Sequence, residues 1–224
     1  MNMDRAIELQ EQAWSFQAKG KLEDALAASR EALDIIERSL GPDSPDAANI
    51  LNDLAEIEIE RQDFSSALAL AERARAIEEA LADRFTGETA ARIRARTLGL
   101  AGEIRRIRGE YACAEADLGE CLATMQAEFG EASEEVVEAR NNLAVLYKYW
   151  GRFDEGLNLY RQALRSTIAA GGEESIAGAT VYHNIGGILH AKGDFGAAEE
   201  PGRKAWEISR RILGGTIHAP CWTR

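Results

Sequence analysis

The sequence predicts an all-α fold, an α-solenoid of about five antiparallel helix pairs. The first observation is a turn-like segment that recurs along the chain, and the second is an amphipathic helix pattern on both sides of each turn. The turn residues are Gly20, Gln62, Gly109, Gly151 and Gly193. Their spacings of 42, 47, 42 and 42 residues are typical of a solenoid whose repeat is one pair of helices.

The third observation is that small side chains stand seven residues before, five after and twelve after every turn. Helices whose axes lie about 8–10 Å apart tolerate only small side chains where they approach most closely. We therefore expect all fifteen positions to be buried between helices. They are Ala13, Ala55, Gly102, Ala144 and Gly186 before the turn, then Ala25, Ala67, Ala114, Gly156 and Ala198, and finally Ala32, Ala74, Cys121, Ala163 and Ala205.

Each repeat is predicted to consist of a first helix, the turn and a second helix, and no segment alternates as a strand does. The first helices are expected at 4–19, 45–62, 88–108, 134–150 and 176–192, and the second helices at 22–40, 64–82, 111–129, 153–170 and 195–213. The array then covers residues 1–214, in repeats at about 4–43, 44–85, 86–131, 132–173 and 174–214. Residues 215–224 form a C-terminal tail that reads as a truncated linker between repeats.

The helix ends repeat with the same period. Glycines suited to a left-handed cap follow four second helices, at Gly41, Gly130, Gly172 and Gly214. Serines that would cap the next helix follow three of them, at Ser44, Ser133 and Ser175. The single 47-residue spacing is explained by a five-residue insertion at 83–87, where DRFTG interrupts the helical pattern.

Composition narrows the class of protein. The 224 residues carry a net charge of −12, which argues against a nucleic-acid partner. No apolar run reaches signal-peptide or membrane-span length, so we expect a soluble, cytoplasmic protein without a membrane partner. The three cysteines lack metal-ligand spacing and fit a reducing compartment.

Two stretches, LGPDSPDAANILNDLAEIEIERQDFSSALALAERARAI and NNLAVLYKYWGRFDEGLNLYRQAL, resemble the tetratricopeptide repeat in the 42-residue form of kinesin light chains. The resemblance covers nearly the whole chain. It implies that first helices line a concave groove for an extended peptide and that second helices form the convex back. The sequence departs from the pattern at Arg140, where an apolar residue is usual, at Pro201-Gly202 inside the last helix, and in a final linker that no helix follows.

The resemblance also implies which side chains face the groove. The peptide-binding candidates are Asn49, Asn52, Arg96, Arg106, Asn141, Asn142, Lys148, His183 and Asn184. An amide offers both a donor and an acceptor, as gripping a peptide backbone requires. The alternative is that these amides bond within the array.

The first helix of the third repeat holds six arginines, at 92, 94, 96, 105, 106 and 108. With Lys148 they would suit an acidic peptide or a C-terminal carboxylate, because arginine presents a rigid fork of donors. The alternative is internal pairing, including a pair between Glu58 and Arg105.

No catalytic motif, metal-ligand set or cofactor loop is present. His183 and His190, seven residues apart on one helix, are too distant to share a metal. The sequence thus predicts a non-enzymatic scaffold or adaptor that binds a protein or peptide. The alternative function is a peptide-sensing regulatory part of a larger signalling protein. Because no capping helix follows, Trp206, Ile208 and Ile212 would form an exposed edge, indicating either a fragment or self-association.

Overall fold

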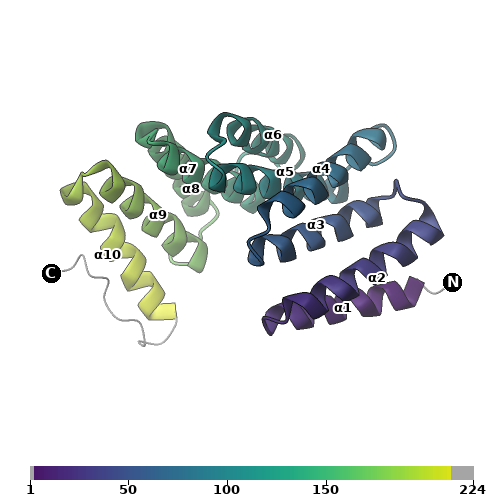
Figure 1. Ribbon diagram of the computed structural model, residues 1–224. Helices are drawn as coiled ribbons and strands as arrows, with labels where there is room; N and C mark the ends of the chain where they lie inside the picture. Colours follow the sequence, from purple (N-terminus) through teal and green to yellow (C-terminus); the bar gives the residue numbers. More distant parts are fainter. Residues whose placement is uncertain (1–2, 213–224) are drawn as a thin grey trace. The chain divides into compact units, whose positions relative to one another are not determined.

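A computed structural model describes residues 3–212, which form an α-solenoid of five antiparallel helix pairs and contain no strand (Figure 1). The predicted helix bounds agree with the structure to within two residues. The helices are α1 (Met3–Ala18), α2 (Leu22–Leu40), α3 (Pro45–Glu60), α4 (Phe64–Ala80), α5 (Glu88–Ile107), α6 (Tyr111–Phe129), α7 (Glu134–Trp150), α8 (Phe153–Ala169), α9 (Ile176–Lys192) and α10 (Phe195–Ile212).

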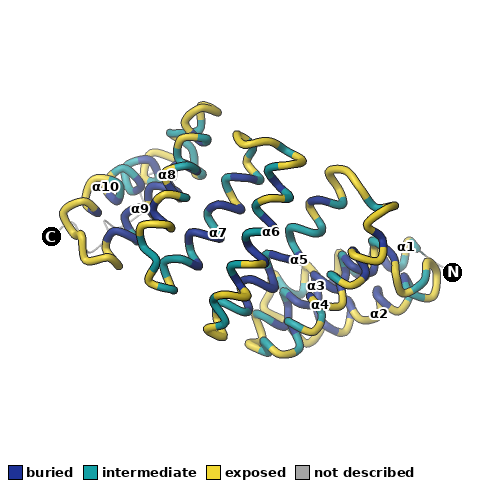
Figure 2. The backbone as a smooth tube through the Cα atoms, turned by 90° about the horizontal axis from the view of Figure 1, so that it is seen from above, coloured by how far each residue is buried: buried dark blue, intermediate teal, exposed yellow. Residues whose placement is uncertain are grey.

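The contacts divide the chain into two compact units. The first unit ends at Cys121 and the second begins at Leu122, so that α6 is shared between them. In the first unit, α1 packs on α2 and α3 on α4, and both α3 and α4 contact α5. In the second unit, α7 packs on α8 and α9 on α10, and α8 also contacts α9. Figure 2 shows buried and exposed residues alternating along most helices, which is the pattern of an amphipathic element, whereas α3 is buried on all sides from Ile50 to Ala55.

The small-residue positions explain how closely these helices pack. All fifteen are buried, as predicted. A methyl group added at Gly102 would lie 2.6 Å from Cγ of Leu118, and one added at Gly156 would lie 3.1 Å from the carbonyl oxygen of Ala144. Larger side chains would therefore push neighbouring helices apart.

Each unit has its own apolar core. In the first unit the core extends from Ala6 to Leu81 and includes Ile50, Leu51 and Leu54. In the second unit Tyr160 and Ile188, each 1% exposed, lie at the centre of a cluster built from α7, α8, α9 and α10. A fully buried aliphatic or aromatic side chain of this kind contributes about 1.5–3 kcal/mol.

The turns and caps follow the predicted chemistry with two corrections, the first being that Gly41 has a positive φ of 93° but, with ψ of 163°, is not in the left-handed helical conformation. All five turn residues have positive φ, and the serine hydroxyls of Ser44, Ser133 and Ser175 accept hydrogen bonds from the backbone N–H three residues on. After α8, however, Gly171 and not Gly172 adopts the left-handed conformation, with φ of 74°. The predicted glycine cap at Gly214 lies outside the described residues.

Gln62 is the one non-glycine residue with positive φ in the part of the chain that the structure describes. Its φ of 63° crowds Cβ against the backbone, a cost of about 1–2 kcal/mol that glycine avoids. Glycine also has more conformational freedom in the unfolded chain, which offsets part of this gain. We therefore expect Gln62→Gly to increase the free energy of unfolding by only about 0.5–1 kcal/mol in urea titrations. The matched control, Gln12→Gly inside α1, should instead lose about 1 kcal/mol.

The last helix pair corrects one expectation about the C-terminal edge. α10 continues through Pro201, and Ile208 is only 3% exposed, so the prediction that Ile208 forms part of an exposed edge is wrong. Its side chain packs with Ala179, Tyr182 and Ala205. Trp206 is half-buried and Ile212 is 43% exposed. The tail at 215–224 lies outside the described residues.

Candidate functional site

The second unit carries a row of amide side chains on its first helices. Asn184 of α9 donates a hydrogen bond of 2.5 Å from Nδ2 to Oδ1 of Asn141 on α7. Asn141 in turn donates from Nδ2 to Oδ1 of Asn142, at 3.4 Å. All three side chains are half-buried. Among the described residues, Nδ2 of Asn142 and Oδ1 of Asn184 have no hydrogen-bond partner, so this amide row retains both donor and acceptor capacity.

Two charged or titratable candidates belong to the same helices. Lys148 of α7 is half-buried, and its ammonium group lies 5.4 Å from the ring centroid of Tyr149. His183, which precedes Asn184 on α9, is exposed. The structure thus places five of the predicted candidates on the first helices α7 and α9.

In the first unit, Arg96 of α5 is already bound by neighbouring side chains. It donates to Asp53 at 2.6 Å, to Glu56 at 2.9 Å and to the side-chain oxygen of Asn49 at 3.1 Å. Burial raises the pKa of Asp53, and the charge of Arg96 and hydrogen bonds from Arg96 and Gln10 partly oppose that rise. Two predicted candidates, Asn49 and Arg96, are therefore engaged with each other and with acids from α3.

Asn52 is fully buried, in contrast to Asn141 at the same position of its repeat. Its Nδ2 donates a 2.8 Å hydrogen bond to the hydroxyl of Thr97, which also lies against a carboxylate oxygen of Glu78. The Asn52 amide thus joins neighbouring repeats and is not presented to a ligand in this structure. Thr97 and Glu78, both missed by sequence reasoning, are the partners that place it there.

Glu78 makes the stability of this region depend on pH. Burial and the nearby charge of Glu79 raise the pKa of Glu78 above the usual 4.5, with burial the larger cause. The hydrogen bond from Thr97 and the charges of Arg94 and Arg75 lower this pKa, but only enough to offset part of the rise. The folded chain then keeps a proton that the unfolded chain has lost, so this group lowers stability as the pH rises through its raised pKa. We expect Glu78→Gln to raise the melting temperature at pH 7–8, with the gain disappearing as the pH falls to 4.5. Thermal unfolding of both proteins across this range measures it, and a pH-independent difference would contradict the assignment.

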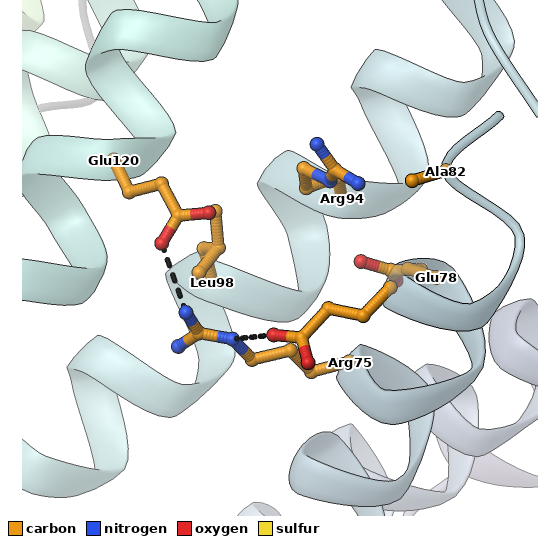
Figure 3. Close-up of a pocket in the computed structure, with 7 residues that line it drawn as sticks. Arg75, Glu78, Ala82, Arg94, Leu98 and Glu120 are labelled. Atoms are coloured by element: carbon orange, nitrogen blue, oxygen red, sulfur yellow. Dashed lines mark hydrogen bonds and ion pairs between the residues drawn. The ribbon is translucent and has the colours of Figure 1, made fainter.

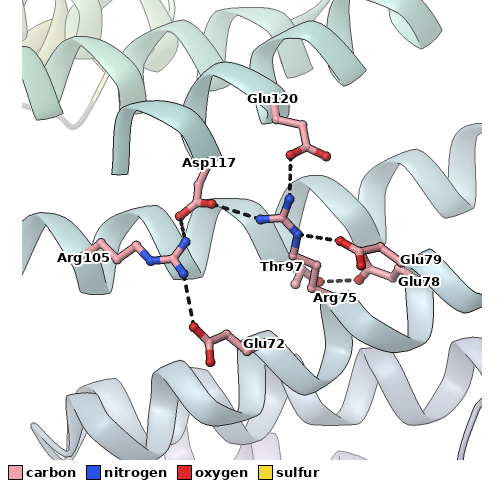
Figure 4. Close-up of polar contacts among 8 residues, drawn as sticks. All are labelled: Glu72, Arg75, Glu78, Glu79, Thr97, Arg105, Asp117 and Glu120. Atoms are coloured by element: carbon pink, nitrogen blue, oxygen red, sulfur yellow. Dashed lines mark hydrogen bonds and ion pairs between the residues drawn. The ribbon is translucent and has the colours of Figure 1, made fainter. Parts of the chain in front are cut away.

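Two arginines near the end of α5 also lie against acids, and Figure 4 shows one of them, Arg105. Arg105 pairs with Asp117 of α6 and with Glu72 of α4, where the nitrogen and oxygen are 3.2 Å apart. Glu58 pairs instead with Arg30 and Arg61, so the predicted Glu58–Arg105 pair is wrong. Glu58 is held by these two arginines, and Arg105 is held by Asp117 and Glu72. Arg106, the last predicted candidate, lies 3.9 Å from Glu103.

Arg140 shows how a charged residue is accommodated where an apolar one is usual. It is 4% exposed, and its guanidinium donates to the carboxylate and the backbone carbonyl of Glu131 and to the hydroxyl of Ser166 at 3.2 Å. This arginine therefore ties the linker before α7 to α8.

Residues 3–212 contain neither a metal-site cluster nor a membrane-spanning helix. No cluster of three or more His, Cys, Asp or Glu side chains there has the arrangement of a metal site. Within the same residues, no helix combines the length and the apolar character needed to span a bilayer.

Solved structures of similar fold include the following three. BtubC (BKLC) from P. vanneervenii is 26% identical, with a TM-score of 0.75 over 93% of this chain and 80% of that one. A putative kinesin light chain from Podosopora anserina with nearly identical TPR-like repeats is 18% identical, with a TM-score of 0.79 over 95% and 99% of the two chains. A Rap protein complexed with competence and sporulation factor is 11% identical, with a TM-score of 0.73 over 94% of this chain and 55% of that one.

Sequence comparison agrees with the fold. Curated protein sequences give no match. The model of the tetratricopeptide repeat, however, matches residues 11–80, 93–167 and 151–211, which is most of the chain. Proteins with these repeats are typically interaction scaffolds without enzymatic activity, and this supports a protein-interaction role in general terms. The chain belongs to the tetratricopeptide repeat family.

Proposed function

We propose that the protein is a scaffold that binds an extended peptide segment of a partner protein along the first helices of its second unit. The observation that carries the proposal is the half-exposed amide row of Asn141, Asn142 and Asn184. A peptide backbone presents alternating N–H and C=O groups, and amide side chains match both. The partnerless Nδ2 of Asn142 and Oδ1 of Asn184 supply one donor and one acceptor for it.

The charged neighbours favour a peptide with acidic side chains. Lys148 lies about two helical turns after Asn141 on the same face of α7, so a carboxylate of the peptide would meet its ammonium group. In the first unit, Arg96 is occupied by Asp53 and Glu56, so it contributes little attraction for an acidic ligand. The Rap neighbour, which was solved complexed with competence and sporulation factor, supports the view that this fold accommodates a partner.

The proposal is tested with a library of extended peptides displayed to the purified protein. Asn142→Ala combined with Asn184→Ala should weaken binding of the selected peptides by about fivefold to 150-fold, because two hydrogen-bonding groups that each contribute about 0.5–1.5 kcal/mol are lost. The matched control is Asn158→Ala, which removes an exposed amide from α8 and should leave binding unchanged. Equal binding by the double variant and the control would overturn the proposed site.

A further inference from the structure

The first helix, α1, exposes two large apolar side chains on one face. Ile7 is 55% exposed and Trp14 is 51% exposed. They are seven residues apart, which is about two helical turns or roughly 10 Å along the axis, so they lie on the same face of α1. The helix is held to the core of the first unit by Ala6, Leu9 and Ala13. Ile7 and Trp14 are therefore left for contacts outside that core.

Hydrogen bonds from α1 to α3 show what lies beside this face. Gln10, four residues before Trp14, donates from Nε2 to Asp53 at 3.3 Å, and Gln17, three residues after it, donates from Nε2 to Glu60 at 2.6 Å. Both glutamines flank Trp14 on the helix surface and reach toward α3. The exposed face of Ile7 and Trp14, here called the Trp14 face, therefore borders α3.

Acidic side chains lie on both sides of the Trp14 face. On α1, Glu11 is exposed and lies four residues after Ile7 and three before Trp14, so it stands between them. On the other side, α3 contains five acidic residues and no lysine or arginine, and its Glu60 is exposed. Residues 1–121 as a whole carry 25 acidic and 15 basic side chains, hence a net charge of −10 out of −12.

The nearest basic side chains do not neutralise these acids. Arg5 of α1 pairs with Glu8 and with Glu31 of α2, at 3.4 and 3.6 Å. On the α3 side, Arg96 is itself held by two acids. Within residues 3–212, neither Glu11 nor Glu60 takes part in an ion pair. The Trp14 face thus combines an apolar surface with uncompensated negative charge.

Other tryptophans of the chain show what a ring of this kind accepts. Arg152 lies over the Trp150 ring at 5.0 Å from its centroid, and Arg210 lies over the Trp206 ring at 4.6 Å. Tryptophan is the aromatic side chain that attracts a cation most strongly. In the described part of the chain, no lysine or arginine covers the Trp14 ring. The same position over Trp14 is therefore open to a cation from outside.

We propose that the Trp14 face binds a positively charged segment of another protein, with an arginine on the Trp14 ring and an apolar side chain on Ile7. The acidic surroundings attract such a segment and repel an acidic one. A polyproline II segment presents every third side chain on one face, about 9 Å apart, which matches the separation of Ile7 and Trp14. The partner is opposite in charge to the peptide proposed for the second unit, so this is a separate binding surface.

NMR titration of the whole protein with the capped peptide Leu-Pro-Pro-Arg-Pro-Lys tests the proposal. The indole N–H signal of Trp14 should shift and saturate. Replacing the arginine and lysine of the peptide with glutamine should weaken binding about three- to tenfold, and replacing them with glutamate should abolish it. Raising NaCl from about 50 to about 500 mM should also weaken binding, because exposed charges are screened. Equal affinities for the basic and acidic peptides would refute the proposal.

Variants of the protein locate the binding surface. Trp14→Ala should weaken binding of the basic peptide by at least about fivefold. Its control, Phe195→Ala, removes a ring of the second unit that is 63% exposed and should leave the affinity unchanged. Glu11→Gln should weaken binding about two- to fivefold, whereas Glu138→Gln, which removes an exposed acid from α7, should have no effect. Equal affinities of Trp14→Ala and Phe195→Ala would contradict the assignment.

Two further measurements separate this surface from other interpretations. The variant that combines Asn142→Ala with Asn184→Ala should bind the basic peptide as the wild type does, because the amide row lies in the other unit. In the absence of peptide, the wild type and Trp14→Ala should sediment alike. If the wild type self-associated and Trp14→Ala did not, a second copy of the chain would cover this face and the proposed partner would be wrong.

Discussion

Replacing Asp117 with alanine is expected to lower the free energy of unfolding by about 3 kcal/mol. Asp117 is 3% exposed, and its two carboxylate oxygens accept hydrogen bonds from Arg75 of α4 and Arg105 of α5 (Figure 4). Without this carboxylate, two guanidinium groups from different helices would face each other across an emptied site. The partial exposure of both arginines and their other acid partners keep the loss at the lower end of the range for broken buried pairs.

The matched control is Glu72→Ala. Glu72 binds the same Arg105, but its side chain is 56% exposed, so its removal should cost less than about 1 kcal/mol. Urea unfolding followed by circular dichroism measures both variants under one set of conditions. If the two losses were equal, the buried carboxylate would not be what joins α4, α5 and α6.

The fold was predictable because its determinants are local and are repeated five times. Helix bounds depend on the apolar period, the left-handed turn and the serine caps, all of which are properties of short segments. The N-terminal cap of α4, which was not among the predicted caps, also has a local cause. Asp63 caps α4 through a 3.1 Å hydrogen bond from the backbone N–H of Ser66, and it directly follows the turn residue Gln62 in the sequence.

The site was less predictable because the position of a residue in its repeat does not determine what the next repeat places opposite it. Asn52 and Asn141 occupy the same position, yet Asn52 meets Thr97 and is buried, whereas Asn141 meets Asn184 and stays accessible. The repeat after Asn52 is the one displaced by the insertion at 83–87, so its offset differs from the others. Pairing across repeats depends on this offset and on side-chain conformation, neither of which the period supplies.

The pocket around Arg94 illustrates the same limit (Figure 3). The sequence places six arginines in one predicted helix and gives no basis for distinguishing them. Their hydrogen bonds and ion pairs in the structure differ. Arg96 and Arg105 are held by buried acids, while Arg94 lines a pocket between α4, α5 and α6, where its charge acts on the buried carboxyl group of Glu78. The insertion was the only hint in the sequence that this part of the array differs from the rest.

Tyr160→Ala is expected to cost about 4 kcal/mol, the largest loss predicted here for the second unit. Tyr160 is 1% exposed and packs with Leu157, Val181 and Ile188, so its removal leaves a cavity that α8 and α9 both border. The matched control is Tyr149→Ala, whose ring is 57% exposed and whose loss should change stability by about 0.5 kcal/mol or less.

The distribution of the Tyr160 effect along the chain matters as much as its size. In a repeat array each repeat rests mainly on its neighbours, so a lost core contact opens the adjacent repeats first. Hydrogen exchange of Tyr160→Ala should therefore show faster exchange in α7 to α10 and little change in α1 to α4. Asp117→Ala should give the opposite pattern, with faster exchange in α4 and α5. Uniform loss of protection in both variants would mean that the two units unfold as one cooperative body.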